Sequence, residues 1–354
     1  PMLVTGLAYV DNDTDFADLF SIGPTTTLVL EDRILRNTAT AWAAYTQWDL
    51  SFADKWTLTL GGRYTDETKE IEFVANPNPL LAAPTAATRV NTANLAAAGV
   101  PLELNTGLFT PRVAIKYDVN EDVNLFASAT RGFKSGGWNA RGTAPTANQA
   151  FEPEKVWSYE AGIRSEWLDR RLRVNLTAFL LDVSDLQTGA AFQAAPGAPI
   201  TFITRNFAGL ENKGLEAEII YQPVDELTLF AFGGLQNAEY KEINPLIVAQ
   251  QTSCRASIAG TGGRAADCNA GIVNPAGNFA EPVRAPDTLT LGGSYSFRLG
   301  EKLTLTPNVM WAWTSDHNVA TSGPPPGIVD SYATLDAGIT LANSNLTDLV
   351  EIRR

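Results

Sequence analysis

The sequence is poor in basic residues, in histidine and cysteine, and in long apolar runs. Its 354 residues include 26 Lys and Arg against 39 Asp and Glu, which gives a formal net charge of −13 at pH 7. A protein that binds nucleic acid needs a basic face to displace counterions, so no nucleic-acid partner is predicted. No stretch approaches about 18 consecutive apolar residues, and this excludes a transmembrane helix.

The start of the chain, PMLVTGLAYV, also lacks the basic residues and the long apolar stretch of a signal peptide. We therefore expect either a cytoplasmic protein or an internal piece of a longer one. The two cysteines, Cys254 and Cys268, have a spacing that fits no zinc or redox pattern, and no metal site is predicted. The flexible Gly/Ala segment between them would let the thiols meet, so we expect a disulfide in an oxidising compartment and two free thiols otherwise.

The abundant feature is an alternation of apolar and polar residues with a period of two, which is typical of β-strands. In WTLTLGGRYTDE (56–67), one face carries Trp, Leu and Tyr, and the other carries Thr, Arg and Glu. RLRVNLTAFLLD (171–182) and GLEAEIIY (214–221) alternate in the same way. The pattern predicts an all-β protein.

Short polar turns alternate with longer, irregular loops along the chain. Turns are predicted at 52–56, 118–123, 167–172, 222–227 and 298–303. Loops are predicted at 75–106, 135–152, 188–208, 242–283 and 318–330. In an up-and-down antiparallel sheet, this order puts all turns on one edge and all loops on the other. The spacing predicts about twelve strands, most of them longer than the usual 5–6 residues of soluble sheets.

A soluble barrel buries its apolar face, whereas an outer-membrane barrel turns that face to lipid and its polar face to the lumen. Long strands, turns separated from loops, and aromatic residues beside the short turns favour the membrane barrel. The aromatic residues are Trp48, Trp56, Tyr117, Trp167, Tyr221 and Phe297. We therefore predict an antiparallel, up-and-down transmembrane β-barrel.

Four motifs resemble those of the TonB-dependent outer-membrane receptors. They are RGFKSGG (131–137), F-x-P-E (151–154), S-Y-E-x-G (158–162) and N-K-G-L-E (212–216). The resemblance covers nearly all of 1–354 and implies the β-barrel domain of such a receptor. Barrels of that family have 22 strands around a globular plug, and they import large, scarce nutrients, most often ferric siderophores, with energy relayed by TonB.

The chain departs from the family pattern at both ends, where the plug, the TonB-binding box and the closing strand are missing. We expect about twelve of the 22 strands, as an incomplete barrel. The sheet should be open and curved, or closed more narrowly, with edge strands at 3–10 and 332–341. The resemblance implies a place in the Gram-negative outer membrane, with its lipid and the TonB complex as partners, an iron chelate as ligand and no cofactor. Alternatives are carbohydrate or cobalamin uptake, or an autotransporter-type translocator.

Charged residues of both signs fall on the predicted lumen face. They are Arg63, Arg112, Lys116, Glu160, Arg164, Glu216 and Glu218. We expect them to pair across strands and to contact the plug, since like charges opposite one another destabilise a sheet. His317, the lone histidine, does not form a catalytic triad with its chain neighbours, so neither an enzyme nor a catalytic residue is predicted. The acidic run 11–15 lacks the later ligands of a calcium loop and is expected to be a solvated loop.

The stretch RGFKSGGWNARG (131–142) ends a strand on the extracellular side. A phosphate-binding loop needs a helix after it, and here a Pro/Asn/Ala-rich loop follows. By parity, Lys134 lies on the lumen face, whereas Arg131 lies near the lipid headgroups. The residues expected to meet an anionic, partly aromatic ligand are Lys134, Trp138, Asn139 and Arg141, with His317 as a further contact to a metal chelate. Alternatively, these residues only fix the geometry of the loop.

Overall fold

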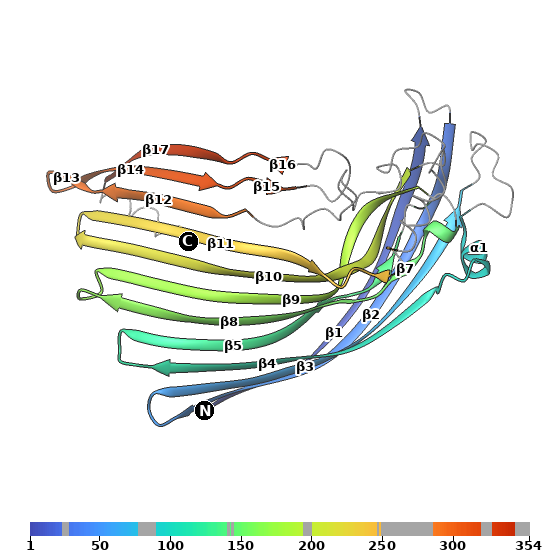
Figure 1. Cartoon of the computed structure of the whole chain (residues 1–354), viewed down its shortest axis with the longest axis horizontal. Coiled ribbons are helices and arrows are strands. Elements are labelled where there is room, and N and C mark those ends of the chain that lie inside the picture. The colour runs from blue at the N-terminus through green and yellow to red at the C-terminus, as the bar shows by residue number, and fades with distance from the viewer. Residues whose placement is uncertain are drawn as a thin grey trace.

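The structure is a computed structural model that describes residues 1–22, 28–76, 90–139, 142, 145–193, 200–245, 248, 286–319 and 328–343. Long antiparallel strands form one open, curved sheet, with short turns along one edge and the longer connections along the other (Figure 1). The predicted all-β architecture is confirmed. Among the described residues, no helix has the length and apolar character needed to span a membrane.

Neighbouring strands of the main sheet follow one another in chain order. The strands of the main sheet are β1 (Met2–Ile22), β2 (Leu28–Phe52), β3 (Trp56–Ala75), β4 (Glu103–Asp118), β5 (Val123–Lys134), β8 (Glu154–Trp167), β9 (Leu172–Gln193), β10 (Ile200–Val224), β11 (Leu227–Lys241), β12 (Thr288–Tyr295), β13 (Phe297–Leu299), β14 (Leu303–Thr314) and β17 (Tyr332–Asn343). Because β12 and β13 both pair with β14, one after the other, the sheet formed by the described residues is twelve strands wide. This width confirms the predicted number of strands.

Short elements lie at the edge of the sheet opposite the short turns. They are β6 (Gly137–Trp138) paired with β7 (Ala150–Phe151), β15 (His317–Asn318) paired with β16 (Ile328–Val329), the helix α1 (Thr92–Ala97) and the 3-10 turn η1 (Pro145–Ala147). Over the described residues, β1 and β17 are the two edges of the main sheet and do not pair with each other. The sheet is therefore open and curved, which is one of the two predicted forms; the other, a narrower closed barrel, is not observed for the described residues.

One face of the sheet, the outer face, carries a band of large exposed apolar side chains. They include Leu3, Leu7, Trp48, Leu60, Val113, Leu125, Leu176, Leu215, Leu229 and Leu335. Beside the short turns the band is bordered by aromatic rings, of which Trp56 and Tyr117 lie 4.4 Å apart between ring centroids. At its other border the first charged residue on the outer face of β3 is Asp66, about ten residues from Trp56, which is the length of a tilted membrane-spanning strand. The outer face is the lipid-facing surface, and the opposite, inner face lines the lumen.

Two segments predicted as loops are strand instead. The described parts of this predicted loop, 188–193 and 200–208, continue β9 and β10, where Thr188 pairs with Arg205 and register shifts occur on both sides of Ala208. The acidic run 11–15 lies inside β1 and pairs with β2, so the predicted solvated loop is wrong. The predicted edge strand at 3–10 is confirmed and extends to Ile22. A long partner strand offers backbone hydrogen bonds to its neighbour, and this context overrides a polar composition. Several strands therefore extend beyond the membrane band.

The largest buried cluster lies on the inner face of this extension. Its members are Leu35, Ile71, Phe73, Val90, Leu95 and Val100. The first three belong to β2 and β3, and the others to the connection that leads to β4. Within this connection, the side chain of Asn91 caps α1 by accepting a hydrogen bond from the amide of Asn94. The connection thereby covers the inner face of β2 and β3 with an apolar layer.

Candidate functional site

All seven charged residues predicted to face the lumen lie on the inner face. The register aligns Arg112 with Thr130 on the next strand, and Ser128 with Glu160. It continues from Thr177 of β9 to Glu216 of β10 and from Asn175 to Glu218. Residues aligned in this way project from the same side of a pleated sheet. The inner face is therefore polar and carries both signs of charge.

Three of these charged side chains bond along their own strand rather than across to a neighbour. Lys116 lies 2.9 Å from the carboxylate of Asp118. Arg63 donates to the hydroxyl of Thr65 at 3.0 Å, and Glu160 accepts from Ser158 at 3.1 Å. Residues two apart on a strand share a face, which explains these local contacts.

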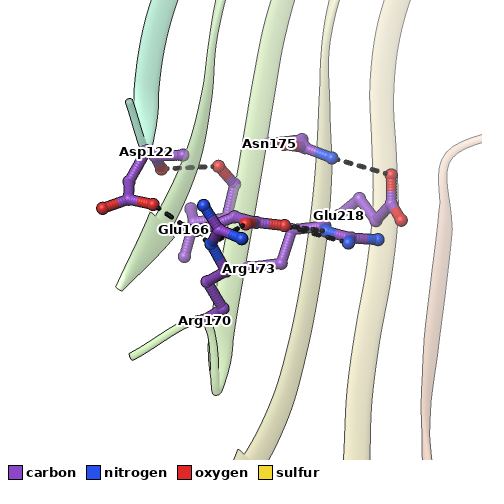
Figure 2. Close-up of polar contacts among 8 residues, drawn as sticks. Asp122, Glu166, Arg170, Arg173, Asn175 and Glu218 are labelled. Carbon is purple, nitrogen blue, oxygen red and sulfur yellow. Dashed lines mark hydrogen bonds and ion pairs between the residues drawn. The ribbon is translucent and has the colours of Figure 1, made fainter. Parts of the chain in front are cut away.

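Pairing across strands occurs near the short turns (Figure 2). Glu166 of β8 lies 3.0 Å from Arg173 of β9 and 3.5 Å from Arg170 in the turn between them. Glu218 accepts a hydrogen bond from Asn175 on the neighbouring strand at 3.2 Å. Exposed pairs of this kind contribute little to stability, so they mainly order the polar side chains on the inner face.

Aromatic rings on the inner face lie across glycines of the next strand. A Cβ added to Gly162 would come within 2.8 Å of the Phe126 ring, and one added to Gly214 would come within 2.5 Å of the Phe179 ring. The guanidinium of Arg164 also lies 5.1 Å from the centre of the Phe126 ring. The glycines of the S-Y-E-x-G and N-K-G-L-E motifs are needed for this close packing.

The glycines and short side chains leave two open hollows on the inner face. One, of about 370 Å³, is lined by Glu216 and Glu218 together with threonines and glycines. The other, of about 280 Å³, is lined by Arg112, Lys116 and Arg164 together with Glu160. The inner wall thus has an acidic hollow on β9–β12 and a mainly basic hollow on β3–β8.

The predicted ligand contacts at 134–139 differ in solvent exposure and in the hydrogen bonds that their side chains already make. Lys134 is exposed on the inner face, in register with Glu154. The indole of Trp138 packs against the buried cluster and donates to the carbonyl of Pro101 at 2.6 Å. Asn139 is buried, and its amide group bonds to the backbone of Gln149 and Thr204. Trp138 and Asn139 therefore hold the loop in place, and Lys134 offers a free cationic side chain.

A buried arginine that no sequence pattern indicated fixes the same loop. Arg33 of β2 is 1% exposed and donates to the carbonyl of Gly142 at 2.8 Å. It also lies 3.2 Å from the carboxylate of Asp18 and over the Phe73 ring at 5.2 Å. The side chain of Asn148 bonds to both backbone groups of Gly142. Arg33 and Gly142 are 109 residues apart, so no local pattern could have identified their contact.

Two further side chains from β9 and β10 brace the other end of the loop. The amide of Gln187 donates to the carbonyls of Ser135 and Glu152, each at 3.0 Å. Asn206 accepts from the Glu152 amide at 2.7 Å and donates to its carbonyl at 2.8 Å. Together with Arg33 and Asn139, they tie the loop after β5 to three other strands, β2, β9 and β10. The register shifts near 206–208 put Asn206 in position.

The remaining predicted sites are not brought together with Lys134. His317 lies in β15, beyond the end of β14, and its Nδ1 is 2.9 Å from the carbonyl of Ser315. In the sheet, β14 is separated from β5 by β8 to β12, so His317 and Lys134 belong to different parts of the wall. Arg141 and the predicted disulfide partners Cys254 and Cys268 lie outside the described residues.

A curved sheet with an apolar outer band and a polar inner wall matches one family of known proteins. The family profile described as TonB dependent receptor-like, beta-barrel, matches residues 2–348. This chain belongs to that family. Members of the TonB-dependent receptor family lie in the outer membrane of Gram-negative bacteria, and so does this barrel wall. Its short turns face the periplasm, and its loops face the exterior.

Individual receptors match parts of this TonB-dependent receptor barrel. The metal-pseudopaline receptor CntO of Pseudomonas aeruginosa is 40% identical over 79 residues, or 22% of this chain and 10% of that receptor. The ferric-pyoverdine M114 receptor PbuA of Pseudomonas sp. strain M114 is 28% identical over 194 residues, or 54% of this chain and 20% of that receptor. The matched segments thus span a fifth or less of the length of these relatives.

Solved structures share the fold over almost the whole chain. The ferric yersiniabactin uptake receptor FyuA from Yersinia pestis aligns with a TM-score of 0.67 at 14% identity, covering 95% of this chain and 43% of that one. The closed form of the ferric-catecholate import receptor Fiu from E. coli K12 aligns with a TM-score of 0.62 at 14% identity, covering 95% and 45%. This barrel wall therefore spans less than half of the length of these structures.

Proposed function

We propose that this chain is the barrel wall of an outer-membrane importer of a ferric siderophore or a related metal chelate, driven by energy from TonB. The observation that carries the proposal is the combination of a lipid-facing apolar band with a charged, hollowed inner face. A wall of this kind encloses a water-filled path wide enough for a large polar solute. The receptors for metal-pseudopaline and ferric pyoverdine named above support a metal chelate as the cargo.

Family membership argues against an autotransporter-type translocator, because the profile that matches residues 2–348 is that of TonB-dependent receptors. The predicted iron chelate is the cargo of this importer and not a resident cofactor. No enzymatic step belongs to the proposal, and the charged inner face serves passage and contact with a domain in the lumen. Uptake of carbohydrate or cobalamin is a different cargo for the same machinery, and the transport assay below separates these cargoes.

Lys134 is the residue of this chain that we expect to contact the cargo at the extracellular mouth. It projects from the inner face at the end of β5, and its neighbours Trp138 and Asn139 fix the loop beside it. Siderophore chelates commonly carry negative charge, and an ammonium group donates to such oxygens strongly. His317, on another part of the wall, remains a predicted contact, and so does Arg141.

The test uses the whole receptor that contains this chain, produced in a Gram-negative strain without siderophore receptors of its own. We expect radiolabelled iron to enter with at least one class of chelate (hydroxamate, catecholate or mixed) and uptake to disappear in a strain that lacks TonB. Uptake that persists without TonB would refute the energy source. Uptake of sugar or cobalamin but of no chelate would refute the cargo.

A pair of variants tests the role of Lys134. Lys134→Gln should weaken binding of the transported chelate about tenfold or more, since a hydrogen bond between charged groups contributes roughly 1.5–3 kcal/mol. Lys302→Gln, in the turn on the periplasmic edge, is the matched control and should leave binding unchanged. Equal affinities of both variants and the unmodified receptor would exclude Lys134 from the site.

A further inference from the structure

The mainly basic hollow of about 280 Å³ lies on the inner face near the short turns, and so toward the periplasm. Its lining includes Thr57 at the start of β3, Asn124 near the start of β5 and Arg164 near the end of β8. Lys134, at the other end of β5, lies about ten residues beyond Asn124, or roughly 33 Å at the rise of a strand. The hollow is therefore separate from the extracellular mouth.

Short side chains form the floor of the basic hollow. Thr59, Ala114 and Ser128 lie side by side in the register of β3, β4 and β5. On β4, Arg112 and Lys116 lie two residues to either side of Ala114, and alternate residues of a strand share a face. Two cations therefore border a floor that leaves room for a ligand.

A third cation reaches the basic hollow from β8. Arg164 is in register with Asn124 of β5, and its guanidinium lies 5.1 Å from the centre of the Phe126 ring. Contact with an aromatic ring positions a guanidinium and leaves its N–H groups for an anion. Arg164 and the two cations of β4 thus line the same hollow from different strands.

The wall itself does not neutralise the two arginines of the basic hollow. Among the residues that the structure describes, no carboxylate pairs with the guanidinium of Arg112 or of Arg164. Glu160, the carboxylate of the lining, accepts a hydrogen bond from a serine of its own strand at 3.1 Å. Lys116 is offset by Asp118 at 2.9 Å. Two guanidinium groups are therefore available to an anion from outside the wall.

Polar side chains of the basic hollow also fit an anion. The hydroxyl of Ser128 and the amide of Asn124 are hydrogen-bond donors on β5. The hydroxyl of Thr59 donates to Asp49 on β2 at 2.6 Å and so engages the carboxylate of the neighbouring strand. Sites for whole small molecules measure about 300–1,000 Å³, so a hollow of about 280 Å³ fits one arm of a large chelate.

We propose that the basic hollow is a second cargo site, where a carboxylate-bearing arm of an anionic chelate binds to Arg112 and Arg164 on its way to the periplasm. The inference rests on the importer proposed above. A planar guanidinium donates two parallel hydrogen bonds to a carboxylate, which gives the site its preference for this group. The hollow is open to the lumen, and passage requires a site that also releases what it binds.

The experiment compares binding with uptake in cells that produce the whole receptor. The probes are an iron chelate of the class that enters in the uptake assay, built with one free carboxylate, and the same chelate with that group as an uncharged amide. Binding is measured in a strain that lacks TonB, and uptake in a strain that has it. We expect the unmodified receptor to import the carboxylate probe faster than the amide probe.

The double variant Arg112→Gln, Arg164→Gln should import the carboxylate probe about tenfold more slowly, since hydrogen bonds between charged groups are lost. Its affinity for the probe at the mouth should not change, and it should no longer distinguish the two probes. The variant Arg112→Lys, Arg164→Lys keeps both charges and should recover most of the uptake rate. Arg173→Gln is the matched control, because Arg173 lies on the same half of the inner face but pairs with Glu166 at 3.0 Å.

Several outcomes would overturn the second cargo site. It is wrong if the glutamine double variant imports the carboxylate probe at the unmodified rate, if Arg173→Gln slows uptake as much, or if the lysine variant recovers nothing. It is also wrong if the glutamine variant melts at a lower temperature or admits a large antibiotic without any chelate. In that case the carboxylate belongs to a domain in the lumen.

Failure of this site and failure of the proposed importer have different signatures. If no chelate enters through the unmodified receptor, the importer is refuted, and the second cargo site falls with it. If chelates enter but their uptake does not depend on the two arginines, only the second cargo site is refuted.

Discussion

Replacement of Arg33 by alanine should open the extracellular layer without unfolding the membrane wall. The side chain is 1% exposed, pairs with Asp18 at 3.2 Å and donates to the carbonyl of Gly142 at 2.8 Å. It also covers the Phe73 ring, which belongs to the buried cluster. Arg33→Ala leaves a carboxylate and a carbonyl without their cation and exposes that ring.

The magnitude follows from these contacts. Removal of one partner of a buried ion pair costs about 3–5 kcal/mol, because the other partner stays desolvated without compensation. The apolar cluster and the braces from Gln187 and Asn206 remain, so the loss concerns the free energy of local opening rather than of global unfolding. A loss of about 3 kcal/mol corresponds to hydrogen exchange that is roughly 150-fold faster in the affected segment.

Hydrogen exchange followed by mass spectrometry measures this effect on the whole receptor in detergent. The peptides over 90–102 and 137–151 should exchange faster, and those over β4 and β5 within the membrane band should not change. Arg36→Ala is the matched control, since Arg36 lies on the same strand and pairs with Glu72 and Asp15 at an exposed surface. Exposed pairs contribute little, so this variant should exchange like the unmodified receptor.

Two results would refute the reasoning about Arg33. The first is unchanged exchange over 137–151 in Arg33→Ala, which would mean that the loop does not depend on the buried cation. The second is an equal acceleration in Arg36→Ala, which would mean that charge on β2 matters and burial does not.

Three other perturbations have defined outcomes. Gly162→Val should lower the melting temperature of the barrel, since its side chain would meet the Phe126 ring and overpacking costs about 1–3 kcal/mol. Asn206→Ala removes three hydrogen bonds and should speed hydrogen exchange over 145–152, at about 1 kcal/mol for each bond. Hydrogen bonds from Lys241, and then from Lys213, lower the pKa of Glu211, so its stabilisation is present above the ordinary value of 4.5 and is lost as the pH falls through the lower folded pKa. Exchange at the extracellular end of β10–β11 should therefore rise below pH 4.5.

Each of these outcomes has a control. Gly189→Ala adds a Cβ where no atom lies within 4 Å and should leave the melting temperature unchanged. A melting temperature of Gly162→Val equal to that of Gly189→Ala would contradict the packing argument. If Asn206→Ala leaves hydrogen exchange over 145–152 unchanged, the other hydrogen bonds are enough to hold this segment in place. The acid effect should vanish in Glu211→Gln, and its persistence there would assign it to another carboxyl group.

The period-two alternation predicted the strands within the membrane band well, because lipid and lumen impose opposite polarity on successive residues. The same alternation predicted that Arg63, Arg112 and Glu216 share one face, and the register agrees. Prediction failed on the extracellular side of the membrane band. Water lies on both faces of the sheet there, so the polarity of a residue no longer indicates whether it belongs to a strand or a loop. The strand segments 188–193 and 200–208 and the acidic part of β1 are the examples.

The sequence by itself determined the class of sheet, the order of the strands and the side of the wall on which each charged residue lies. These properties depend on the local period and on the alternation of turns and loops, and both are written in consecutive residues. Only the tertiary structure decided that Asn139 and Arg33 hold the extracellular loop, and that the side chain of Lys134 has no partner among the described residues. Those contacts join residues from distant strands, and they depend on the register and the register shifts of the sheet, which no single segment encodes.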